Sequence, residues 1–375
     1  MTSSSRTRLV LVIALAFLVG VGAGVGGVGV ASRLLSGQPL LASGTAAGTS
    51  ATPTASPAAK SPTPVQSPTP EPVSPAIRYS AGGAFDQARG KLVLFGGQDL
   101  PDVATGASGS PVYTNETWTW DGHLWTLQHP IHSPSARSHA AMAYDAARRL
   151  VVLEGGTDRN WLNDSWTWDG SDWKQVVPLG ALPFNGGFPV MTYDSGRKAI
   201  LLVPQTGPCP CIYPNDVWSW DGTTWTKLAT TGQRPPGNAP DYASMAYLPT
   251  IKSTVFFTRM AGSPTAWALD DALNWTQLSS SGGSSSGEWS TAFDDRLGAV
   301  VLVGNLGDAW SFDGTQWKAI GSVSPLPIAR SVTVFDSVHG MVIYFADSAQ
   351  DTWTWDGSKW SRAGLAQSWM AERAV

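Results

Sequence analysis

Histidine and cysteine side chains are the first candidates for catalysis or metal binding in this chain. Its five histidines are His123, His129, His132, His139 and His339, and four of them fall in one short stretch. His129 and His132 are near enough in sequence to share a metal ion. Pro130 stands between them, however, and the neighbouring sequence offers no third ligand, so we expect an ordinary loop. The histidines therefore predict neither a metal site nor a cofactor.

The two cysteines, Cys209 and Cys211, are separated only by Pro210. Two thiols are too few for a disulfide framework or for a Cys-rich zinc or iron–sulfur site. They form either a small loop disulfide or two thiols, and export from the cytoplasm would favour the disulfide.

Composition limits the classes of partner. The 375 residues are 14% charged with a net charge of −4, so no basic surplus is present to neutralise a phosphate backbone, and we expect no nucleic-acid partner. Forty glycines and 27 prolines indicate many turns, and 19 tryptophans are the most unusual feature.

A tryptophan-rich motif recurs six times and predicts a hairpin. Its clearest form is Trp-Thr-Trp-Asp-Gly followed by another Trp, as at Trp118 to Trp125. Alternation places both indoles on one face of a strand, and Asp-Gly predicts a tight type I′ turn. We expect these side chains to be core residues that hold the repeats together. They are Trp118, Trp120, Trp125, Trp166, Trp168, Trp173, Trp218, Trp220, Trp225, Trp267, Trp275, Trp310, Trp317, Trp353, Trp355 and Trp360.

A second motif precedes each hairpin. An aromatic-Asp pair such as Phe85-Asp86 or Tyr144-Asp145 is followed by an apolar run such as Leu92 to Phe95. Short apolar runs bounded by turns predict strands that are buried on both faces. Each repeat then contains four strands, and four-stranded units at this period are typical of a β-propeller. The sequence predicts an all-β, six-bladed propeller over residues 77–363, closed without exchange of a strand between its first and last blades.

The second repeat resembles a kelch repeat. The resemblance rests on Arg137-Ser138-His139, Gly155-Gly156 and Asn163-Asp164, with Gly96-Gly97 in the first repeat and Arg330 in the sixth. It covers about residues 77–362 and implies a propeller similar to the central domain of galactose oxidase, as a divergent member. The double glycine is missing from the third, fourth and sixth repeats.

The N-terminal region predicts export. Arg6 and Arg8 in residues 1–8 precede an uncharged apolar run over residues 9–31, long enough to cross a bilayer as a helix. The arginines should stay cytoplasmic, so residues 9–31 are expected to be a transmembrane signal-anchor or, alternatively, a cleaved signal peptide. Residues 32–76 are rich in Ser, Thr, Ala and Pro and are expected to be a disordered linker. Residues 364–375 form a C-terminal tail.

Binding is expected on the face that carries the longer loops. In a propeller, the loops between the second and third strands share a face with the connections between blades, and loops on a rigid scaffold commonly bind ligands. The candidate contact residues there are Tyr113, His129, His132, Arg137, Arg159, Trp161, Tyr213, Arg234, Arg259, Trp289 and Arg330.

These features favour a non-catalytic binding module at the cell membrane. A single-pass anchor would hold the propeller outside the cytoplasm, facing an unknown protein or a cell-envelope glycan; if the signal is cleaved, the protein is secreted. The alternative is a propeller enzyme, either a copper oxidase like galactose oxidase or a glycoside-active enzyme. No catalytic constellation of residues is evident in the sequence.

Overall fold

The computed structural model describes residues 74–76, 78–99, 110–177, 180, 183, 188–204, 216–235, 243–260, 263–279, 282–283, 289–323, 331–346 and 351–363. All of them belong to one compact unit, Ser67–Val375. They form an all-β fold with one short 3₁₀ helix at Pro249–Ile251. In these described ranges no helix is long and apolar enough to span a membrane. The predicted transmembrane segment, linker and tail fall outside them, apart from residues 74–76.

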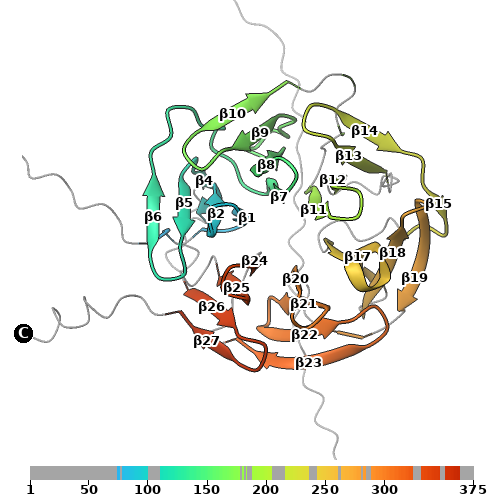
Figure 1. The fold of residues 1–375 in the computed structure, drawn as a ribbon. Coiled ribbons are helices and arrows are strands. Elements are labelled where there is room, and N and C mark those ends of the chain that lie inside the picture. The colour runs from blue at the N-terminus through green and yellow to red at the C-terminus, as the bar shows by residue number, and fades with distance from the viewer. Residues whose placement is uncertain are drawn as a thin grey trace, which may run out of the picture. The chain divides into compact units, whose positions relative to one another are not determined.

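The strands form six antiparallel sheets in sequence order, and each is one blade of a propeller (Figure 1). The strands of blades 1 to 3 are β1 (Gly82–Asp86), β2 (Lys91–Phe95), β5 (Thr117–Trp120) and β6 (Trp125–Gln128); β7 (Ala141–Asp145), β8 (Leu150–Glu154), β9 (Ser165–Trp168) and β10 (Trp173–Val176); and β11 (Val190–Asp194), β12 (Ala199–Val203), β13 (Val217–Trp220) and β14 (Trp225–Leu228).

The strands of blades 4 to 6 are β16 (Ser244–Leu248), β17 (Ser253–Met260), β18 (Ser263–Asp270) and β19 (Asn274–Ser279); β20 (Trp289–Asp294), β21 (Ala299–Gly304), β22 (Asp308–Phe312) and β23 (Trp317–Ser322); and β24 (Val332–Asp336), β25 (Met341–Ala346), β26 (Asp351–Trp355) and β27 (Trp360–Arg362). A short strand, β15 (Thr231–Gly232), pairs in parallel with β19 at the edge of blade 4. Strands β3 (Gln98–Asp99) and β4 (Val112–Tyr113) form a separate ribbon.

The six innermost strands surround a common axis. Strands β1, β7, β11, β16, β20 and β24 each contact the next one, and β24 contacts β1 to close the ring (Figure 1). The strands of blade 1 all come from the start of the propeller sequence (β1, β2, β5 and β6) and those of blade 6 all from its end (β24 to β27). The predicted all-β, six-bladed propeller closed without strand exchange is therefore confirmed.

The hydrophobic core consists of six clusters, one between each pair of adjacent blades. The second strands supply fully buried side chains, as Leu92 to Phe95 of β2 illustrate with at most 1% exposure. Ten of the sixteen hairpin tryptophans are buried and the other six are half-buried. Indoles from one blade reach the next: the Trp173 ring of blade 2 lies 5.2 Å from Phe95 of blade 1, edge to face.

The Asp-Gly turns differ from the predicted type I′ geometry, and that prediction is wrong. Trp120 pairs with Trp125, so four residues form the loop, and in this loop only Gly122 has a positive φ, of 100°. Asp121 instead uses Oδ1 to accept hydrogen bonds from the backbone N–H groups of His123 and Leu124. The aspartate is a side-chain cap for the loop, which explains why it recurs without a left-handed backbone.

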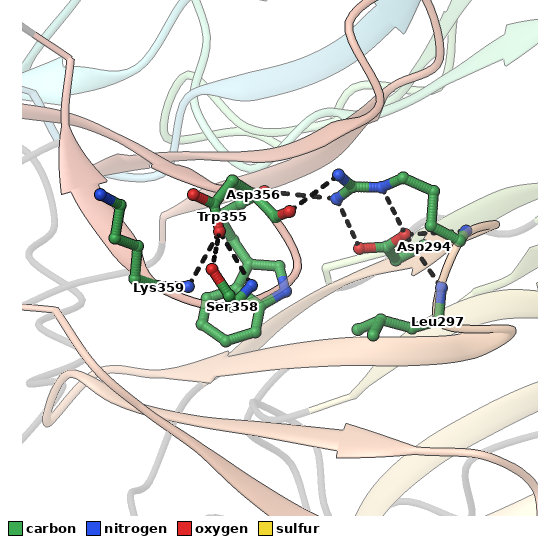
Figure 2. A network of polar contacts seen from close by, with 7 residues as sticks. Asp294, Leu297, Trp355, Asp356, Ser358 and Lys359 are labelled. Carbon is green, nitrogen blue, oxygen red and sulfur yellow. Dashed lines mark hydrogen bonds and ion pairs between the residues drawn. The ribbon is translucent and has the colours of Figure 1, made fainter.

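The aspartates of the aromatic-Asp motif organise the turns between first and second strands. Asp294 is fully buried, and its oxygens accept hydrogen bonds from Arg296 Nε (3.3 Å) and Nη2 (3.1 Å). The same guanidinium donates to the carbonyl of Asp356 in the next blade, at 2.9 Å. Figure 2 shows Asp294 and Asp356 on the two sides of this contact. The turn of blade 5 is thereby fastened to the Asp-Gly hairpin of blade 6.

The same clamp recurs around the ring with different side chains. In the five blades that have a hairpin glycine, a Cβ added to it would meet the preceding blade's turn residue. That residue is Arg89 at Gly170, Arg148 at Gly222, Ile251 at Gly314, Arg296 at Gly357 and His339 at Gly122, while Arg197 donates to the carbonyl of Asp270. His339 of blade 6 is thus the turn residue that faces the hairpin of blade 1, where the ring closes.

Candidate functional site

An axial pocket opens on the face that carries the connections between blades. It has a volume of about 190 Å³ and is lined by the first residues of all six inner strands. Because an inner strand begins where the connection from the preceding blade ends, the pocket lies at the loop-bearing end of the axis. The predicted candidate Trp289, at the start of β20, is one of its lining residues and is 8% exposed.

Three aromatic rings stand beside this pocket. His139, which lines it, stacks on Phe188 with ring centroids 4.0 Å apart. The predicted candidate Trp161 packs edge to face on Phe188 at 5.6 Å and keeps 43% of its surface exposed. We refer to His139, Phe188 and Trp161 as the aromatic cluster. It joins an exposed indole to the rim of the axial pocket, across the ring from blade 5.

Hydroxyl groups line the opposite side of the pocket, on blades 4 to 6. Ser290 Oγ lies 2.5 Å from Thr333 Oγ1 and 3.4 Å from Ser331 Oγ, linking blades 5 and 6. Thr291 Oγ1 donates to the carbonyl of Met245 at 3.4 Å. Ser244 Oγ is buried and has no hydrogen-bond partner among the described residues. We refer to Ser244, Ser290, Thr291, Ser331 and Thr333 as the hydroxyl arc.

Arg137 has a different surrounding from the exposed candidates. It is 1% exposed, and its guanidinium donates to the Gly155 carbonyl at 2.9 Å and to both Asp164 oxygens at 2.5 and 2.9 Å. Burial raises the pKa of Asp164, but the hydrogen bonds and charge of Arg137 outweigh burial, so that pKa lies below its usual value. Arg137 therefore holds a loop in place, and its guanidinium is buried and not exposed on the loop face.

Arg78 repeats this arrangement in blade 1. It is 3% exposed and donates to the Gly96 carbonyl at 3.0 Å and to Glu116 Oε2 at 2.6 Å. Glu116 also accepts from Trp118 Nε1 at 2.8 Å. A buried arginine, a double glycine and an acid two residues before the first hairpin tryptophan thus form one structural unit in each of the first two blades.

The remaining described candidates are spread over the loop face and the perimeter. His132 is exposed and bonded to Asp172 at 2.8 Å, at the start of the outer strand β10. Tyr113 lies in β4, and His129, Arg159 and Arg234 are exposed on loops. Arg259 lies in β17, opposite Pro264. Of all these candidates, the structure brings only Trp161 and Trp289 to the surroundings of the axial pocket.

Four predicted residues lie outside the described ranges: Tyr213, Arg330, Cys209 and Cys211. Within the described ranges, no three side chains of His, Cys, Asp or Glu are arranged to hold a metal ion.

The other end of the axis carries a ring of aromatic residues. A second cavity of about 370 Å³ is lined there by one aromatic side chain from each blade, namely Phe85, Tyr144, Tyr193, Tyr247, Phe293 and Phe335. Tyr144 Oη accepts a hydrogen bond from the Ala88 backbone N–H of the preceding blade at 3.1 Å. Burial and the nearby Asp86 carboxylate raise the Tyr144 pKa. This end is therefore built mainly from contacts between blades.

Sequence reasoning missed Phe188 and the hydroxyl arc. A signal for the arc was present, since small or hydroxyl residues recur two or three positions before the aromatic residue of most inner strands, as Ser244 before Tyr247 and Ser290 before Phe293. Such residues are common in any Gly-rich chain, and only ring closure brings them to one wall. Phe188 stands two residues before β11, and nothing in its local sequence distinguishes it.

Comparison with known proteins supports the fold and leaves the family open. No family model matches the chain, and no curated protein matches it. Among solved structures, that of YjhT is similar with a TM-score of 0.51 and 13% identity, covering 78% of this chain and 99% of that chain. Two others have TM-scores of 0.41. A chain of a nidogen/laminin complex has 12% identity over 66% of this chain and 81% of its own. A protein of unknown function from Bacteroides thetaiotaomicron has 14% identity over 77% of this chain and 87% of its own.

Proposed function

We propose that this protein is a kelch-type propeller that acts as a non-catalytic binding module, with its loop face directed at a protein or glycan of the cell envelope. The observation that carries the proposal is the aromatic cluster, because it places the exposed indole of Trp161 next to the axial pocket. Exposed aromatic groups beside a preformed concavity are typical of binding sites. The kelch assignment rests on the arginine, double-glycine and acid unit of the first two blades.

The proposal also places the propeller outside the cytoplasm on a single-pass anchor, residues 9–31, because an apolar run follows two arginines there. Full-length protein should then be in the membrane fraction and be released by detergent but not by high salt. N-terminal sequencing that finds a start near residue 32 would favour the secreted form instead.

Binding is tested with the full-length chain on a panel of immobilised glycans and on isolated cell-envelope glycan. We expect Trp161→Ala to weaken binding about tenfold, because the exposed contact surface is lost. The matched control is Leu124→Ala, which removes an apolar side chain 56% exposed from an Asp-Gly hairpin, away from the loop face. Equal effects of the two variants, or turnover of a glycan by the wild type, would contradict the proposal.

A further inference from the structure

The axial pocket has two chemically different sides. Blades 4 to 6 contribute the five hydroxyls of the arc, set among apolar groups such as Met245, Trp289 and Val332. Blades 1 to 3 contribute Gly, Ala, Met, Pro and Val residues such as Met142, Pro189 and Met191, with Ser80 as the single hydroxyl among their described lining residues. The aromatic cluster extends the second side outward through His139. A guest that matches this pocket has one polar edge and one apolar face.

The hydroxyl arc keeps unused hydrogen-bonding capacity. Each hydroxyl has one donor and two acceptor lone pairs. The contacts among Ser331, Ser290 and Thr333 require two donors from three hydroxyls, so one O–H and several lone pairs remain. Ser244 Oγ makes no hydrogen bond to the described residues, and rotation of its side chain can turn it toward a guest. The arc can therefore both donate to and accept from neutral hydroxyl groups.

The pocket disfavours a charged guest. Its lining, taken from the described residues, contains no Asp, Glu, Lys or Arg. A cation entering it would lose hydration without gaining an opposite charge, which is strongly unfavourable. For an anion the lining offers only the His139 imidazole, which already stacks on Phe188 and bonds to Ser138 Oγ. At about 190 Å³ the pocket is also smaller than the roughly 300 Å³ at which drug-sized sites begin. A small, neutral group is the best match.

We infer that the axial pocket binds a single neutral sugar ring, with the ring's hydroxyls on the arc of blades 4 to 6 and its C–H face toward blades 1 to 3. A sugar ring has C–H groups on its faces and hydroxyls around its edge, which is the pattern of the pocket. The inference rests on the proposed function of the loop face and narrows it to a ligand class. The aromatic cluster would then contact the next unit of a longer glycan.

The test titrates the full-length chain with glucose, galactose, mannose and N-acetylglucosamine, followed by saturation-transfer NMR and calorimetry. Glucuronic acid and glucosamine serve as charged counterparts. We expect at least one neutral sugar to bind about tenfold more tightly than either charged one. Thr333→Val and Ser244→Ala should each weaken that binding about tenfold, since each removes a hydroxyl of the arc.

The control is Thr192→Val, which makes the same change on inner strand β11 at a residue that lines the cavity at the other end of the axis but not the axial pocket, whereas Thr333 lines both. It should leave sugar binding within about twofold of wild type. Thermal unfolding of each variant shows that the fold is intact, and Ser290→Ala replaces Thr333→Val if the latter fails to fold.

Three results would overturn the inference: no neutral sugar binds, a charged sugar binds more tightly, or Thr192→Val has the same effect as Thr333→Val. If glycan binding that depends on Trp161 persists in those cases, the proposed function of the loop face stands without the axial subsite. If Trp161→Ala and Leu124→Ala are also indistinguishable, the proposed function fails as well.

Discussion

In blades 1, 2 and 3, the tryptophan that starts the outer strand uses its indole nitrogen to join two blades. Trp173 Nε1 donates to Thr117 Oγ1 of the preceding blade at 2.8 Å, and Trp225 Nε1 donates to Ser165 Oγ at 3.1 Å. Both acceptors occupy the position directly before the first hairpin tryptophan. The bond satisfies a donor that has been removed from water, so the acceptor matters as much as the indole.

Trp275, the outer-strand tryptophan of blade 4, lacks such an acceptor. The residue that would supply it, directly before the first hairpin tryptophan of blade 3, is Val217, which is fully buried in the same cluster as Trp275. Trp275 Nε1 is buried and has no hydrogen-bond partner among the described residues. An unpaired buried donor costs about 1–3 kcal/mol.

Val217→Thr is therefore expected to stabilise the protein by about 1 kcal/mol, because threonine has the shape of valine and adds an acceptor for Trp275. Denaturant unfolding measures the change. The gain should disappear in a Trp275→Phe background, where no donor remains. A loss of stability of the same size in both backgrounds would mean that the hydroxyl is simply buried without a partner.

At the scale of elements, the double glycines are required by close contact between blades. Gly96 has a φ of 70°, and a Cβ built on it would lie 2.4 Å from the Arg137 carbonyl oxygen of blade 2. Gly97 N–H donates to that same oxygen at 2.8 Å. The loop between second and third strands thus packs directly against the following blade.

Gly96→Ala should destabilise the protein by about 2–4 kcal/mol, because both the backbone conformation and the contact are unfavourable for a side chain. Gly90→Ala is the control. Gly90 has a similar φ of 63°, but its added Cβ would meet only a Val338 methyl group, at 3.4 Å. Its cost should be about 1 kcal/mol. Equal losses in thermal or denaturant unfolding would show that φ alone explains the glycine.

The elements themselves were predictable from sequence because their signals are local and repeated. Trp-x-Trp alternation and the apolar runs define the third and second strands of each blade, as in β5 and β2. The axial pocket was not predictable, since Ser244 and Thr333 come from blades far apart in sequence. Their hydroxyls face one space only after the ring closes. The geometry of the Asp-Gly loops was also not predicted. The Asp-Gly dipeptide indicates a type I′ turn, but Asp121 instead caps its loop through side-chain hydrogen bonds to the backbone.

At the scale of the whole molecule, the ring is closed between blade 6 and blade 1 by noncovalent contacts. Trp125 Nε1 donates to Thr352 Oγ1 at 3.1 Å, and the Trp125 ring lies 5.0 Å from Phe345, edge to face. These contacts join residues at opposite ends of the propeller sequence. Every other pair of adjacent blades is also connected by the chain, whereas the chain does not run directly between blades 6 and 1, so opening at this junction lets these two blades separate.

Thr352→Val should therefore have a larger effect on local opening than Thr117→Val, although both remove an acceptor from an indole at equivalent positions. Each is expected to cost about 1–2 kcal/mol of global stability. Hydrogen exchange measured by mass spectrometry should show faster exchange across β1, β2, β24 and β25 in Thr352→Val. In Thr117→Val, blades 1 and 2 stay linked by the chain, so we expect no local opening between them. Exchange should then be faster only for amides that exchange through global unfolding. Equal exchange patterns in the two variants would show that the covalent connections between blades add nothing to their docking, and that every junction of the ring opens alike.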